Sequence, residues 1–144
     1  MENVNLYEIK KNQTNFAQVT ITGSQDAEQF IRQFYSDDIE VYESFFILLL
    51  NAMNKTIGYA KISQGGVVST VVDVKILAKY VVDSLATSVV LAHNHPSGNL
   101  KKSDADSQIT KRIIECLNYF DCKVLDHIIL TKESYYSFAD NGDI

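Results

Sequence analysis

The segment from Leu91 to Asp106, "LAHNHPSGNLKKSDAD", decides how the rest of the chain is interpreted. Two histidines flank one asparagine, a Pro-Ser-Gly run follows, and a serine then precedes an aspartate by three positions. The apolar residues that lead into the segment predict a short buried strand, and Pro96 disfavours helical geometry at His95. The residues after it have the spacing of an amphipathic helix. The segment is therefore a polar connection between a strand and a helix.

The side chains of this connection have the chemistry of metal ligands. His93 and His95 lie two apart in an extended chain, so both leave the same face with their Cα atoms roughly 6–7 Å apart. Two imidazoles at that separation can converge on one ion, because a Zn–N bond is only about 2.0–2.1 Å long. Gly98 permits the chain to reverse, and Asp106 then faces back from the first turn of the next helix. Two histidines and one carboxylate form a catalytic type of zinc set, which leaves a position open for water.

Each residue of this set also has a simpler interpretation. Ser103 followed by Asp106 is a near capping box for the helix, and taken alone the cap is the stronger hypothesis. A lone histidine such as His93 is more often a hydrogen-bonded polar residue than a ligand. The joint pattern H-x-H-x7-S-x2-D favours a site, because four chemically matched residues fall at fixed offsets. The cap and the site are compatible roles for Ser103.

A hydrolytic metal site needs a base that accepts a proton from its water. The candidates upstream are Glu28, Glu40 and Glu43, and Glu43 is the best placed because it begins the buried run "ESFFILLL". From the residues alone, a solvated glutamate at the start of a strand remains the stronger interpretation of Glu43.

The hydrophobic pattern predicts strands that alternate with helices, and hence an α/β sandwich. Strands are expected at residues 16–22, 43–51, 57–63, 88–95 and 123–130, and helices at 24–35, 73–87 and 104–119. Ser24 and Asp73 are the expected N-caps of the first two helices. A glycine-bearing loop is expected at 64–70, and a polar, aromatic tail at 134–144. The helix residues expected to face inward are Phe30, Ile31, Phe34, Val74, Leu77, Ala78, Val81, Leu85, Ile109, Ile113, Cys116 and Leu117.

Length and composition predict a single domain over residues 1–144, since 144 residues with 46% hydrophobic content suffice for one core. The net charge of −5 argues against a general nucleic-acid binder, and Lys101 and Lys102 are expected to be solvated. No signal peptide is recognisable, and the longest apolar run, 45–50, is too short to span a membrane. The two cysteines, Cys116 and Cys122, suit a reducing cytoplasm and are expected to be small buried hydrophobes.

The motif "HNHPSGNLKKSDAD", with "YESFFILLLN" upstream and "KVLDHIILT" downstream, resembles the RadC-type branch of the JAMM/MPN metallopeptidases. The resemblance extends from about Asp37 to the end of the chain, and the block from His93 to Asp106 is its most specific part. The segments "QGGVVSTVVDVK" and "YYSFADNG" are most similar to the short, stand-alone bacterial members, which lack the helix-hairpin-helix segment of longer RadC proteins.

This resemblance implies a mixed sheet flanked by helices, of the cytidine-deaminase-like kind. It implies zinc held by His93, His95 and Asp106, and it matches Glu43 to the family's upstream glutamate, above Glu40. Ser103 matches the motif serine, whose hydroxyl is expected to bind the oxyanion. Lys102 stands where proline is common, which concerns loop stiffness more than chemistry. The implied activity is zinc-dependent hydrolysis of amide bonds in a peptide or protein substrate, as a metallopeptidase or isopeptidase.

His127, in "LDHIIL", has three interpretations: a third imidazole ligand, a partner of a ligand, or a buried strand histidine. Because Asp106 already fills the third position, the last two are favoured. The neighbouring Asp126 could accept the ring N–H of a ligand histidine.

The sequence is also compatible with other functions. The main alternative is an accessory or binding module associated with DNA repair or mobile elements, in which the zinc is structural; direct DNA binding is disfavoured by the net charge. A deaminase has little support because the expected PCxxC ligand pair is absent. The sequence does not identify the substrate. Strand addition or helix packing could give a homodimer, but no sequence feature fixes the oligomeric state.

Overall fold

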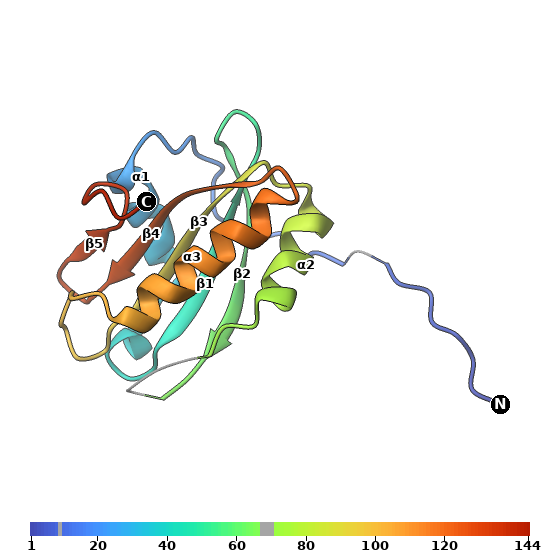
Figure 1. Cartoon of the computed structure of the whole chain (residues 1–144), viewed down its shortest axis with the longest axis horizontal. Coiled ribbons are helices and arrows are strands. Elements are labelled where there is room, and N and C mark those ends of the chain that lie inside the picture. Colours follow the sequence, from blue (N-terminus) through green and yellow to red (C-terminus); the bar gives the residue numbers. More distant parts are fainter. Residues whose placement is uncertain (9, 67–70) are drawn as a thin grey trace.

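A mixed five-stranded sheet forms the centre of the molecule (Figure 1). The computed structural model describes residues 1–8, 10–66 and 71–144. The strand order is β2-β1-β3-β4-β5, with β3 and β4 parallel and the other neighbours antiparallel. The strands are β1 (Ser44–Leu50), β2 (Thr56–Gln64), β3 (Ser88–Asn94), β4 (Lys123–Leu130) and β5 (Tyr135–Ser137).

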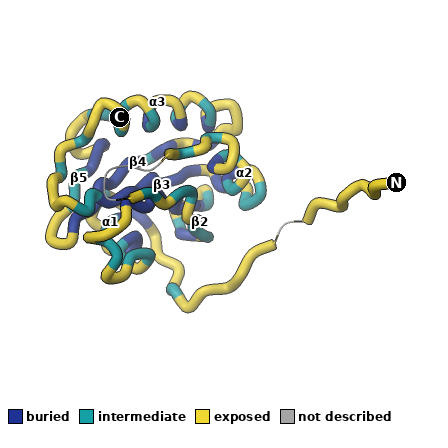
Figure 2. The backbone as a smooth tube through the Cα atoms, turned by 90° about the horizontal axis from the view of Figure 1, so that it is seen from below, coloured by how far each residue is buried: buried dark blue, intermediate teal, exposed yellow. Residues whose placement is uncertain are grey.

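Helices cover both faces of the sheet, as the α/β sandwich prediction requires. Helices α2 (Val74–Ser84) and α3 (Asp104–Asn118) lie on one face, and α1 (Ser24–Ile31) lies on the other. Two short 3₁₀ turns, η1 (Arg32–Phe34) and η2 (Asp37–Glu40), follow α1. Figure 2 shows the buried strands enclosed between helices whose outer surfaces are exposed. The prediction of a mixed sheet flanked by helices is confirmed.

Strands β1 and β3 are buried along their whole length because helices cover both of their faces. Phe45, Ile47 and Leu49 pack toward α2 and α3, whereas Leu48 and Leu50 pack toward α1. This alternation continues in β3 and assigns successive side chains to opposite faces of the sheet. At the end of β3, His93 and Asn94 therefore project to opposite faces of the sheet.

The strand expected at residues 16–22 does not form. Its pairing is reduced to one isolated bridge between Thr20 and Lys55, with a further backbone hydrogen bond from Ile21 N to Asn54 O at 2.8 Å. The segment also contacts the first residue of β2, where Thr56 N donates to Val19 O at 2.9 Å, but no ladder continues from there. The polar and apolar alternation of this segment was therefore a misleading signal.

Two details of the predicted helices are wrong. Gly23, not Ser24, occupies the N-cap of α1, and the Ser24 hydroxyl instead donates to Asp140 in the C-terminal tail. Leu85 does not face inward: it ends α2 in the left-handed conformation, with φ of 56°, and 80% of it is exposed. By contrast, Asp73 caps α2 as expected, with its carboxylate 2.9 Å from Lys75 N.

The polar, aromatic tail contributes a fifth strand. Residues 135–137 pair with the end of β4, and Phe138 behind them is buried against the sheet. The loop expected at 64–70 lies partly outside the described residues. Cys116 and Cys122 are both free thiols. In the part of the chain that the structure describes, no helix is long and apolar enough to cross a membrane.

Candidate metal centre

Three elements meet at one end of the sheet and bring the predicted site residues together. His93 is the penultimate residue of β3, and His95 follows immediately after the strand. Asp106 lies in the first turn of α3, and Glu43 directly precedes β1, which pairs with β3. Residues 50 or more positions apart in the sequence are therefore neighbours in the fold.

The histidine and aspartate side chains form a compact set of donor atoms. The Nε2 atoms of His93 and His95 are 3.0 Å apart. The Asp106 carboxylate lies 3.2 Å from Nε2 of His93 and 3.4 Å from Nε2 of His95. Tetrahedral zinc bonds of about 2.0–2.1 Å place neighbouring ligand atoms about 3.3 Å apart. Each separation is therefore close to the edge length of a tetrahedral metal site, with Asp106 facing His93 through Oδ1 and His95 through Oδ2.

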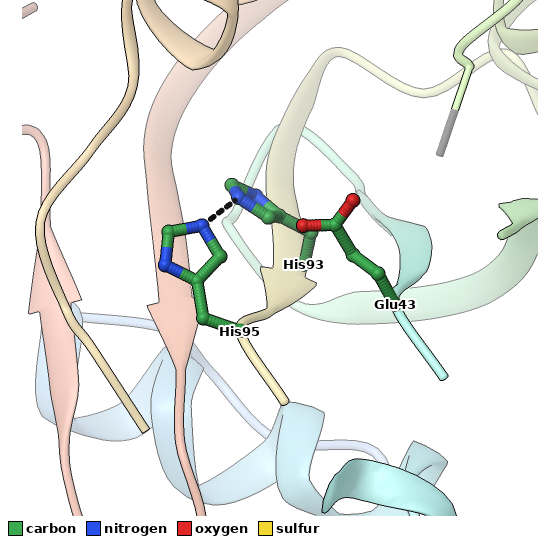
Figure 3. A group of neighbouring side chains, drawn as sticks. All are labelled: Glu43, His93 and His95. Carbon is green, nitrogen blue, oxygen red and sulfur yellow. Dashed lines mark hydrogen bonds between the residues drawn. The ribbon is translucent and has the colours of Figure 1, made fainter. Parts of the chain in front are cut away.

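Glu43 completes the cluster. Its carboxylate and the ring nitrogens of His93 and His95 all lie within 4.8 Å of one another, so these three residues also form a candidate metal-binding group. Figure 3 shows the carboxylate turned toward the two imidazoles. The residue is buried, and its backbone pairs with the end of β2 through hydrogen bonds to Gly65 and Gly66. Glu43 is therefore not the solvated strand-start residue that its sequence context alone favoured.

The capping box holds the Asp106 carboxylate in place. Ser103 Oγ accepts from Asp106 N at 3.0 Å, and Asp106 Oδ2 accepts from Ser103 N at 2.8 Å, so the predicted cap is confirmed. Burial opposes ionisation, but the contacts with His93 and His95 outweigh it and hold the pKa of Asp106 far below its usual range. The carboxylate is thus ionised and aimed at the two imidazoles.

The turn after β3 orients the second imidazole. His95 Nδ1 lies 2.6 Å from the carbonyl oxygen of Asn99, and Gly98 has a φ of 84° that lets the turn close. A carbonyl can only accept, so Nδ1 of His95 carries the proton of the neutral ring and Nε2 offers its lone pair to the site. Burial lowers the pKa of His95, but the Asp106 carboxylate and the Asn99 carbonyl raise it more. The surroundings of the His95 ring therefore favour positive charge there.

Asn94, between the two histidines, ties the metal-site strand to the Glu43 segment. It projects to the opposite face of the sheet and is completely buried. Its Nδ2 donates to the carbonyls of Ile39 and Tyr42, both at 2.7 Å, and its Oδ1 accepts from Ser44 N at 2.8 Å. The side-chain amide of Asn94 thus fixes the backbone on both sides of Glu43. No pattern in the sequence indicated this role.

We expect Asn94→Ala to lower the free energy of unfolding by about 2–3 kcal/mol, because it leaves up to three backbone groups without their partner. Urea unfolding followed by circular dichroism measures the change, and Asn118→Ala, an exposed asparagine at the end of α3, is the matched control. Equal stability of the two variants would contradict this account of Asn94.

His127 contacts a candidate ligand but is not part of the donor set. It is completely buried on β4, and its Nε2 lies 2.7 Å from Nδ1 of His93. Complete burial, reinforced by His93, lowers the pKa of His127 well below its usual value, so the ring is neutral. The suggestion that Asp126 receives a ligand's ring N–H is wrong. Asp126 points to the opposite face and accepts from Ser137 Oγ at 2.6 Å and Ala139 N at 3.0 Å.

A pocket of about 530 Å³ opens beside the cluster. Glu43, His93, His95, Ser103 and Asp106 all contribute to its walls. Val71, Val72, Lys101, Ile109 and Arg112 also line it.

Lys102, which was expected to be solvated, is instead half-buried and fastened to the C-terminal tail. Its Nζ lies 2.5 Å from Asp143 Oδ1, and the same carboxylate accepts from the Tyr136 hydroxyl at 2.5 Å. The two contacts lower the pKa of Asp143, with the larger contribution from Lys102. The loop before α3 is therefore anchored by the tail.

A mixed five-stranded sheet flanked by three helices is consistent with a JAB/MPN domain. A sequence profile of the RadC-like JAB domain matches residues 21–143, and the chain belongs to this family.

Two relatives are similar over most of the chain. A protein of Flavobacterium johnsoniae named "UPF0758 protein" is 43% identical over 122 residues, which cover 85% of this chain and 52% of the relative. A protein of Porphyromonas gingivalis with the same name is 37% identical over 124 residues, covering 85% of this chain and 54% of the relative. The chain thus spans about half the length of the curated relatives it matches.

Proposed function

We propose that this domain is a zinc-dependent hydrolase of amide bonds that acts on peptide or protein substrates, as a metallopeptidase or isopeptidase. The observation that carries the proposal is the convergence of two imidazole Nε2 atoms, 3.0 Å apart, with the Asp106 carboxylate, whose Oδ1 and Oδ2 lie 3.2 and 3.4 Å from them, beside a buried glutamate. The Nε2 atoms of both imidazoles and the carboxylate of Asp106 face one another at these distances, an arrangement that a shared cation would satisfy. The donor set therefore fits a metal ion.

His93, His95 and Asp106 would hold the ion. Nitrogen and carboxylate donors in a three-residue set are those of catalytic zinc sites. When bound, zinc supplies Lewis acidity, which polarises a carbonyl group and makes water a stronger acid.

Two further side chains would handle protons and charge. The Glu43 carboxylate would accept a proton from the attacking water and deliver it to the nitrogen of the leaving amine. Ser103 Oγ accepts from Asp106 N within the cap, which leaves its own O–H available. That hydroxyl lines the pocket and would donate to the oxygen that becomes negative during the attack.

The remaining pocket walls favour a peptide that carries an acidic side chain next to an apolar one. Val71, Val72 and Ile109 supply the apolar wall, and Lys101 and Arg112 supply positive charge. Neither of these two cations forms an ion pair with any residue that the structure describes. Arg112 follows Asp106 by six residues, about 9 Å along the helix, which corresponds to about three residues of an extended substrate.

Incubating the zinc-loaded, tag-free protein with a defined peptide library, and identifying products by mass spectrometry, tests the proposal. We expect chelator-sensitive cleavage, with acidic residues enriched about three positions from the new terminus. Arg112→Glu should remove or reverse this enrichment, whereas Lys111→Glu, an equal charge change at an exposed neighbour outside the pocket, should preserve it.

Stoichiometric zinc without cleavage of any library member, or of isopeptide-linked counterparts, would contradict hydrolysis. Such a result would favour an accessory module with a structural metal. Cleavage without a preference for acidic residues would support amide hydrolysis and contradict only the proposed substrate preference.

A further inference from the structure

We infer that the buried hydroxyl of Thr110, acting through His127, sets which nitrogen of His93 faces the metal site. Thr110 and His127 would then be positioning residues rather than ligands. The inference rests on the proposed metal centre, but its central observable, the ring tautomers, exists without metal or substrate.

A continuous chain of short contacts links His93 to Asp106 behind the proposed metal site. His93 Nδ1 lies 2.7 Å from His127 Nε2, and His127 Nδ1 lies 2.6 Å from Thr110 Oγ1. Thr110 Oγ1 lies in turn 2.6 Å from the backbone carbonyl of Asp106, one helical turn earlier in α3. The chain thus starts at one proposed ligand and ends on the backbone of another.

Counting protons along this chain gives a single consistent arrangement. The Asp106 carbonyl can only accept, so the one proton of the Thr110 hydroxyl belongs to that contact. Thr110 Oγ1 must then accept from His127, which places the proton of this ring on Nδ1. His127 Nε2 is consequently an acceptor, and His93 Nδ1 must be the donor to it.

The reverse arrangement is unfavourable. If His127 Nε2 donated to His93, the Thr110 proton would have to point at His127 Nδ1. The hydroxyl oxygen and the Asp106 carbonyl oxygen would then face each other at 2.6 Å with no proton between them. The hydroxyl of one buried threonine therefore selects the tautomers of two histidines.

The selected tautomer leaves the lone pair of His93 Nε2 directed at His95 and Asp106, as a metal ligand requires. Packing prevents escape by ring rotation. The His127 ring stacks on Phe138, with centroids 4.7 Å apart, and meets the edge of Phe45 at 5.4 Å. The orientation of His93 is thus set from behind through Thr110, His127 and Phe138, none of which lines the pocket.

The first test is a long-range ¹H–¹⁵N correlation spectrum of metal-free, tag-free protein, in which protonated and bare ring nitrogens differ in shift. The chain contains three histidines, so the signals are readily assigned with His95→Ala and His127→Gln variants. We expect a proton on Nδ1 and a bare Nε2 in His127, and a proton on Nδ1 of His93. A His127 ring protonated on Nε2 would overturn the inference, whether or not the protein hydrolyses any amide.

The second test compares Thr110→Val, which keeps the shape and removes the hydroxyl, with Thr110→Ser, which keeps the hydroxyl. Zinc affinity measured by chelator competition should fall about 10–100-fold in the valine variant and recover in the serine variant. The valine variant should also lose the His127 Nδ1 tautomer in the same spectrum. Unchanged affinity in a folded Thr110→Val protein would overturn the functional part of the inference, and a misfolded valine variant leaves the decision to the wild-type spectrum.

Discussion

Replacing Glu43 with glutamine is expected to lower kcat for amide hydrolysis by about 10²–10⁴-fold, the range typical of a lost general base. The substitution preserves the size and hydrogen-bonding capacity of the side chain, so the buried position before β1 should remain intact. Because His93, His95 and Asp106 are the proposed ligands, the zinc content should stay unchanged. Initial rates on a cleaved library peptide, together with elemental analysis of the same preparation, measure both quantities.

Glu40→Gln is the matched control for Glu43→Gln. Glu40 is an exposed acid three positions earlier, on η2, and its carboxylate lies 3.5 Å from Lys132 Nζ rather than in the cluster. Its substitution should leave kcat unchanged. A Glu43→Gln protein as active as the wild type would contradict the base assignment. Loss of zinc from that variant would instead indicate that Glu43 is a ligand, as its membership of the candidate metal-binding group allows.

The local parts of this site could be predicted from the sequence because they are encoded over short distances. His93 and His95 share a strand end, and Ser103 and Asp106 share one helical turn, so their relative positions follow from the repeat of each element. The approach of Glu43 could not be derived in this way. It depends on β1 pairing beside β3 and on Asn94 reaching across to the backbone around Ser44, and the family resemblance alone indicated it.

The contacts behind the site were the hardest to predict. Thr110 has the spacing of an ordinary helix residue, and the parallel pairing of β3 with β4 is what brings His127 beside His93. Asp126 was assigned the wrong partner because adjacent strand residues project to opposite faces, and the face of β4 cannot be read from an apolar run buried on both sides. The left-handed end of α2 at Leu85 has a similar cause: an apolar residue at helical spacing does not show where the helix stops.

Removal of one proposed ligand should abolish stoichiometric metal binding. We expect wild-type protein, purified without a histidine tag, to carry about one zinc ion per chain, and His95→Ala to carry almost none, since three protein ligands are the usual minimum for such a site. His95 is suited to this test because its ring lies beyond the end of β3 and is only partly buried, so its loss should not unfold the sheet. Elemental analysis of both proteins gives the ratio.

Thermal unfolding with and without added zinc provides an independent measure of the same event. A ligand at about 100 times its Kd stabilises the folded state by about 2.7 kcal/mol, so zinc should raise the Tm of the wild type and leave that of His95→Ala unchanged. Lys101→Ala, an exposed residue of the same loop, should respond like the wild type. A wild-type protein that folds fully, contains no metal and gains no stability from zinc would contradict the metal centre. The lone pairs that converge at 3.0–3.4 Å would then have to share a proton instead.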